Sequence, residues 1–140
     1  MATLGNLVWF IFGGWFTALA WLFAGVVMAC TVIGLPFAFA AFRLASFSAC
    51  PFGRELVDAR DVGGKRITGT GAANLIWFLL PGWILALSHF AAAVAMILIS
   101  ATVLPIFLGS LAWAVAHARL ARVAIAPLGK RIVSRRSALG

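Results

Sequence analysis

The sequence predicts an all-α integral membrane protein built from two tandem helical-hairpin repeats, and three observations support this prediction. Of the 140 residues, 64% are apolar and only 10% are charged, whereas an ordinary soluble domain carries about 25% charged residues. The charged residues fall into two blocks, 43–66 and 119–136, which leaves the runs 2–42 and 67–118 uncharged. The third observation is an internal repeat. A soluble monomer is excluded, because it would expose very large apolar patches to water.

The repeat relates short motifs in the two halves of the chain. Segments 6–10 and 74–78 read NLVWF and NLIWF, 68 residues apart, and each half closes on a signature, CPFGR at 50–54 and APLGK at 126–130, 76 residues apart. The second half has therefore gained about two helical turns. We expect this gain before Arg119, in the last helix, which should be the longest.

Length decides how many membrane segments each half can hold. As helix, the first uncharged run would extend about 62 Å and the second about 78 Å, each at least twice the hydrocarbon thickness of about 30 Å. About four membrane segments therefore fit, a hairpin in each repeat. Glycine and proline interrupt these runs and predict kinks or breaks. The interruptions are Gly13-Gly14, Gly34-Leu35-Pro36, Pro81-Gly82 and Pro105.

The chain divides into a first membrane repeat (1–57), a cytoplasmic linker (58–73) and a second membrane repeat with a basic end (74–136). The positive-inside rule places both charged blocks, and with them both termini, on the cytoplasmic side of a multi-pass protein. Segments 43–54 and 119–130 mix apolar residues with spaced cations, which predicts cytoplasmic interfacial helices.

The sequence offers little that could carry chemistry. The net charge of +8 flanks membrane segments, so nucleic acid is not the expected partner. No catalytic pair, metal-ligand set or cofactor motif is visible, so we expect no enzyme. His89 occupies the repeat position of Trp21. It is either a functional intramembrane group or a neutral imidazole bonded to a carbonyl or to a hydroxyl such as Ser88 or Ser100.

Taken together, the two Asn-Leu-x-Trp-Phe…Gly-Trp segments, the Leu-Pro steps and the two Pro-x-Gly-Arg/Lys signatures resemble the YccF family of bacterial inner membrane proteins. The resemblance covers about residues 5 to 133. It implies a multi-pass protein of the bacterial inner membrane and implies no reaction. The second half departs from the first in its extra residues and in lacking a glycine before Leu104-Pro105.

Two functions follow as hypotheses. The leading one is a homo-oligomeric channel lined at the broken segments by Thr31, Pro36, Thr102 and Pro105, with His89 as a further candidate. The alternative is a scaffold or accessory subunit that binds anionic lipid headgroups or another membrane protein. The candidate cations, at a pore mouth or at lipid, are Arg43, Arg54, Arg119, Arg122, Lys130 and Arg131.

Overall fold

The computed structural model describes residues 2–65, 68–102 and 108–135, and its two halves contain the same series of elements. The first half consists of α1 (Ala2–Trp9), α2 (Trp15–Ala29), α3 (Leu35–Ala49) and β1 (Arg54–Asp58). After a short 3₁₀ helix (Ala59–Val62), the second half consists of α4 (Thr70–Trp77), α5 (Trp83–Thr102), α6 (Leu108–Ile125) and β2 (Lys130–Ser134). Each half is thus a kinked helix, a helical hairpin and a strand.

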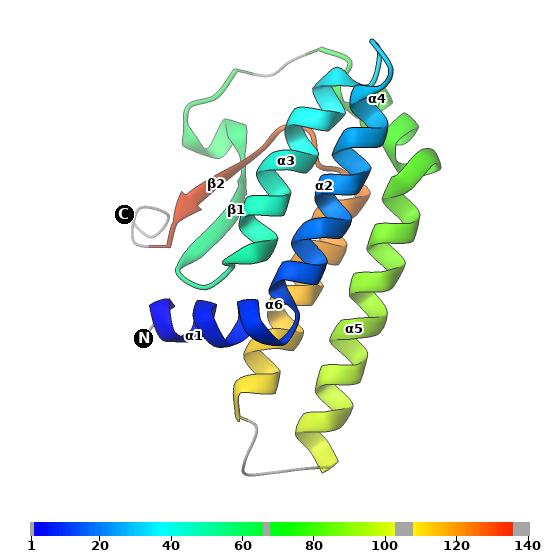
Figure 1. Ribbon diagram of the computed structural model, residues 1–140. Helices are drawn as coiled ribbons and strands as arrows, with labels where there is room; N and C mark the ends of the chain where they lie inside the picture. Colours follow the sequence, from blue (N-terminus) through cyan, green and yellow to red (C-terminus); the bar gives the residue numbers. More distant parts are fainter. Residues whose placement is uncertain (1, 66–67, 103–107, 136–140) are drawn as a thin grey trace.

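A kink separates the first helix of each half from the hairpin that follows. The segments Phe10–Gly14 and Phe78–Gly82 are π-type turns that contain one non-helical residue each. A β-carbon on Gly14 would overlap the ring of Trp9, and one on Gly82 would overlap the ring of Trp77. Glycine at these positions lets each tryptophan fold back across the kink, so that α1 lies across the end of α2 (Figure 1).

The two hairpins run in opposite directions. Trp77 stacks on Phe37 at the start of α3 and bonds to Ala124 at the end of α6. Trp9 bonds to Ser48 at the end of α3 and packs on Trp113 in the first half of α6. Helices α3 and α6 are therefore antiparallel, and the α2–α3 turn lies at the opposite end of the molecule from the end of α5 and the start of α6 (Figure 1). The sequence analysis instead predicts two hairpins that both start and end on the cytoplasmic side of the membrane, which would place both turns at the same end.

The strands β1 and β2 form an antiparallel ribbon that pairs the ends of the two repeats, with Leu56 opposite Ile132 at its centre. The sequence analysis missed this ribbon, and the interfacial helices that it predicts over 43–54 and 119–130 are helical only over 43–49 and 119–125. Helix α3 ends at Ala49 and α6 at Ile125, and each is followed by a turn into a strand. The turn glycines have φ of 83° and 81°, the left-handed conformation that glycine adopts without a Cβ clash.

The core lies between the hairpins, and the apolar surface lies on the side away from the ribbon. Trp21, Phe47, Trp77 and Leu120 are fully buried. Exposed large apolar side chains are crowded on α2, on α5 and on the kinks that precede them, whereas α3 and α6 carry few among the described residues. The helical segments Ala2–Ala29 and Thr70–Ile99 are long and apolar enough to cross a membrane. The strands of the ribbon and the apolar helix α5 lie on opposite sides of the molecule (Figure 1).

The extra residues of the second half lengthen both arms of its hairpin. Helices α5 and α6 have 20 and 18 residues, against 15 each for α2 and α3. The expectation that the last helix is the longest is wrong, because α5 is longer. A hairpin gains packed length only when both of its arms grow.

Candidate functional site

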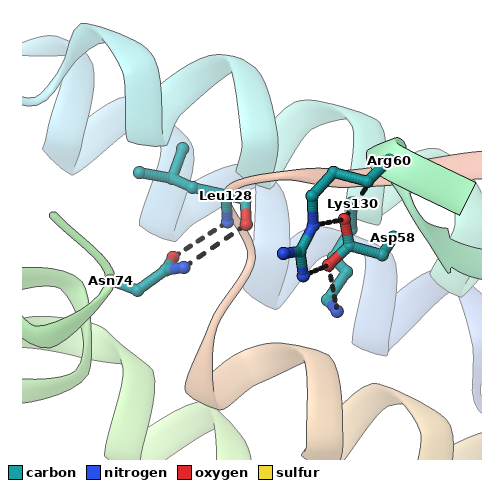
Figure 2. A network of polar contacts seen from close by, with 5 residues as sticks. All are labelled: Asp58, Arg60, Asn74, Leu128 and Lys130. Carbon is teal, nitrogen blue, oxygen red and sulfur yellow. Dashed lines mark hydrogen bonds and ion pairs between the residues drawn. The ribbon is translucent and has the colours of Figure 1, made fainter. Parts of the chain in front are cut away.

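The repeated asparagines tie each kinked helix to the turn before its strand. Asn6 donates from Nδ2 to the Phe52 carbonyl at 3.0 Å and accepts from the Phe52 amide at 2.9 Å. Asn74 makes the same two bonds with Leu128, at 3.3 and 3.0 Å (Figure 2). A side-chain amide can satisfy a backbone donor and acceptor at once. The asparagine of the repeated motif is therefore part of the scaffold.

The repeated tryptophans hold the ends of the hairpins in the same way. Trp9 Nε1 donates to the Ser48 carbonyl at 2.7 Å, and Trp77 Nε1 donates to the Ala124 carbonyl at 2.8 Å. Both acceptors lie near a helix end, where carbonyls lack an intrahelical partner. The Asn–Trp clasp, defined as these asparagine and tryptophan bonds, thus explains why the motif recurs.

The centre of the molecule holds a buried chain of three polar rings, and here the two repeats differ. Trp21 Nε1 donates to Nε2 of His89 at 3.0 Å, and Nδ1 of His89 lies 3.1 Å from Nδ1 of His117. His89 is 3% exposed and His117 is 9% exposed. His89 therefore bonds to aromatic nitrogen rather than to a neighbouring hydroxyl, while Ser88 donates to the Leu85 carbonyl. The side chain of Ser100 lies outside the described residues.

The sequence analysis missed the pairing of His89 with His117, although a signal was present. His89 lies 16 residues before Pro105, where the sequence predicts a helix break, and His117 lies 12 residues after it. Residues at similar distances on the two sides of a hairpin turn lie close together across its two arms. The expected break near Leu104-Pro105 could therefore have placed the two histidines together.

A pocket of about 400 Å³ lies beside the histidines, between α2 and α5. Thr17 and Ser88 are its hydroxyl side chains, and none of its lining residues among those described is charged. Its rim includes Phe12 and Phe16, which are 74% and 66% exposed. The pocket is therefore apolar at its mouth and polar at its inner end. Its full lining is Phe12, Gly13, Trp15, Phe16, Thr17, Ala20, Ser88, His89, Ala92 and His117.

The ribbon carries an ion-pair network at the outer end of β1 (Figure 2). Asp58 accepts from Arg60 Nε at 2.9 Å and from Arg60 Nη2 at 3.1 Å, and Lys130 Nζ lies 3.7 Å from Asp58 Oδ2. The side-chain bond from Arg60 holds the pKa of Asp58 well below its usual range. Arg60, Lys65 and Lys130 line a pocket of about 490 Å³ beside the network, with Asp58 as its one acid among the described residues.

The structure brings some of the candidate cations together and leaves others apart. Arg119, Arg122 and Lys130 line a second surface pocket, of about 320 Å³, with Glu55. Lys130 lines both surface pockets. The remaining three are Arg54, which donates to the carbonyl and hydroxyl of Ser46, Arg43, which is exposed on α3, and Arg131, which is exposed on β2.

The candidate pore residues do not meet within the described part of the chain. Thr31 is exposed in the turn after α2, where it donates to the Met28 carbonyl, and Pro36 is exposed at the start of α3. Pro105 and the side chain of Thr102 lie outside the described residues. The α2–α3 turn and the end of α5 are at opposite ends of the molecule (Figure 1). Among residues 2–65, 68–102 and 108–135, no group of three metal-ligating side chains occurs.

The mostly helical fold, with its apolar helical face, defines a helical membrane protein. The model of the YccF family, described as "Inner membrane component domain", matches residues 4–54 and 72–130, consistent with the two repeats. The inner membrane proteins YccF of Escherichia coli K12 and of Shigella flexneri are each 32% identical over 139 residues, covering 96% of this chain and 88% of theirs. No solved structure matches. The chain belongs to the YccF family and is an inner membrane protein.

Proposed function

We propose that this protein is a non-catalytic membrane scaffold whose ribbon face binds the phosphate headgroups of anionic lipids. The supporting observation is that Lys130 lies between two surface pockets that are both rich in cations. Each Lys or Arg near an anionic surface contributes about 1 kcal/mol of attraction. The Asp58–Arg60 pair beside Lys130 neutralises the nearest acid, so the pockets keep a positive balance.

The same proposal includes an orientation in the bilayer. If the antiparallel hairpins crossed the membrane, their turns would reach opposite surfaces and the ribbon would lie at mid-depth. Arg54 and Lys130 would then each cost about 2.5 to 3.5 kcal/mol in the hydrocarbon. In addition, Val32 and Ile33 at the first turn are 86% and 78% exposed, an unusual composition for a turn in water.

We therefore orient the ribbon and both termini toward the cytoplasm, with the hairpins lying along the cytoplasmic leaflet. The layer of α3 and α6 separates the ribbon from α2 and α5, and packed helices are about 8 to 10 Å apart. Helices α2 and α5 then reach a depth that fits half of a hydrocarbon core of about 30 Å. This orientation keeps the cytoplasmic side that the cations predict and replaces the crossings by insertion into one leaflet.

A homo-oligomeric channel is the second candidate, and it requires the other orientation. Copies would surround a lumen with their ribbons, which would shield the mid-depth cations from lipid. The apolar length of the Thr70–Ile99 segment favours it, because that segment is long enough to cross. The separation of the α2–α3 turn from the end of α5 weighs against the lining predicted from the sequence.

Native mass spectrometry of the detergent-solubilised protein tests headgroup binding. Dioleoylphosphatidylglycerol should bind more tightly than dioleoylphosphatidylcholine, and Lys130→Gln should weaken the phosphatidylglycerol affinity about fivefold, as expected for about 1 kcal/mol. Arg43→Gln removes the same charge outside both pockets and is the matched control. An equal loss in both variants, or no preference for the anionic lipid, would contradict the proposal.

A further inference from the structure

The hydrogen bonds of the buried ring chain fix the protonation of both histidines. An indole nitrogen can only donate, so Nε2 of His89 must be the acceptor from Trp21. His89 is then neutral with its proton on Nδ1, and that proton points at Nδ1 of His117, 3.1 Å away. His117 must accept through Nδ1, so it is neutral with its proton on Nε2. The hydrogen bonds between the three rings therefore run in one direction, from Trp21 through His89 to His117.

Because the hydrogen bonds between the three rings run in one direction, one donor, the Nε2–H of His117, remains at the last ring. His117 has no hydrogen bond to a described residue other than the one through Nδ1. Among the described residues, every side-chain nitrogen and oxygen that is completely buried in the protein has a hydrogen-bond partner. The Nε2–H of His117 is therefore not sealed in the protein, and His117 lines the pocket between α2 and α5.

The surroundings of the pocket restrict what could accept this hydrogen bond. The exposed rings of Phe12 and Phe16 are at its rim, on the apolar face that the membrane covers. An anion would lack a cationic partner among the described lining residues, and burying an unpaired charge is very costly. A carbonyl oxygen on an otherwise apolar molecule satisfies both conditions, because it accepts a hydrogen bond and enters from hydrocarbon.

We propose that this pocket binds the carbonyl of a lipid-soluble molecule through Nε2–H of His117, with His89 as the positioning residue that holds the tautomer. Two sources share this chemistry, the ester carbonyl of a phospholipid and the ring carbonyl of a quinone. The pocket volume of about 400 Å³ lies within the range of small-molecule sites. Both histidines belong to the second repeat, and the first repeat has Trp21 and Ala41 at the equivalent positions. The first repeat therefore has no second copy of this site.

The chain has only two histidines, so nitrogen NMR of ¹⁵N-histidine protein carried on a tag without histidine reads the site directly. The protein is placed in nanodiscs of ether-linked phospholipid, which has no carbonyl, in nanodiscs of ester-linked phospholipid, and in ether-linked nanodiscs with decylubiquinone. In all three, His89 should be protonated on Nδ1 and His117 on Nε2. The Nε2–H proton of His117 should move downfield with ester lipid, with quinone or with both, and the responding arm identifies the source.

Two variants separate binding from folding. Ala92→Phe fills the pocket and should abolish the shift while the tautomers stay unchanged, whereas Val94→Phe, on the same helix but outside the pocket lining, should leave the shift intact. His117→Leu should weaken binding of the responding molecule about tenfold, the worth of one good hydrogen bond. The reverse tautomers, or an Nε2–H signal that is identical in all three membranes, would overturn the proposal.

Discussion

The two repeats share a scaffold but differ at their centre. Both use an asparagine to clasp the closing turn and a tryptophan to bond the end of a hairpin helix, with nearly equal distances. At the centre, however, Trp21 of the first repeat meets His89 of the second, and His117 stands where the first repeat has Ala41.

This difference teaches which repeated features build the fold and which serve something else. Features present in both copies satisfy backbone groups that either half would otherwise leave unpaired. A feature present in one copy is not required by the shared architecture. The histidine pair and the pocket beside it are therefore the part of the molecule most open to a function.

The largest expected effect tests whether the two tryptophans are equivalent. Trp9→Ala and Trp77→Ala each remove a buried ring and the partner of a buried carbonyl, and each should lower the free energy of unfolding by about 3 to 5 kcal/mol. Unfolding by SDS in mixed micelles measures both. If one of the two variants had nearly the unfolding free energy of the unmodified protein, the two tryptophans would not be equivalent.

Asparagine replacement should be the next largest effect and should again be symmetric. Asn6→Leu and Asn74→Leu each abolish two hydrogen bonds to one backbone residue, at an expected cost of about 2 to 3 kcal/mol. The same SDS titration is the measurement. A loss of unfolding free energy in only one of the two variants would show that Asn6 and Asn74 contribute unequally to stability.

A change at the centre should affect the fold less than loss of a clasp. His89→Phe keeps an aromatic ring but leaves the buried Trp21 N–H without its acceptor, which should cost about 1 to 2 kcal/mol. His89→Gln supplies an acceptor and should recover part of this loss. Equal stability of both variants would argue that the Trp21–His89 bond contributes nothing.

The smallest effect concerns Asp58, whose equivalent in the second strand is Ser134. The pKa of Asp58 is lowered in the folded protein, first by the side-chain bond from Arg60. Its contribution is therefore complete above the unfolded pKa of about 3.9 and is lost as the pH falls through the folded value. The free energy of unfolding should decline below about pH 4, and Asp58→Asn should make that decline shallower. An identical acid profile in Asp58→Asn would contradict this reading.

The sequence predicted the membrane class, the repeat and the helical hairpins, because hydrophobic runs and spacing record them directly. It could not predict the antiparallel packing of the hairpins, since a contact such as that between Trp77 and Phe37 depends on tertiary structure. The ribbon was missed because its strands are short and because the interfacial helices predicted over 43–54 and 119–130 included the first residue of each strand, Arg54 and Lys130. His89 was recognised as a candidate, but its partner His117 required the hairpin register.

The opposite directions of the two hairpins restrict how the molecule can lie in the bilayer. In the orientation that we propose, the symmetry axis follows the membrane normal, the α2–α3 turn lies in lipid and the ribbon side faces the cytoplasm. The most direct test labels Val32→Cys and Val62→Cys, each in a Cys30→Ala/Cys50→Ala background, with a membrane-impermeant maleimide on right-side-out and inverted vesicles. We predict that Val62→Cys is labelled only in inverted vesicles and that Val32→Cys is labelled in neither. Labelling of Val32→Cys from either side would contradict insertion into one leaflet.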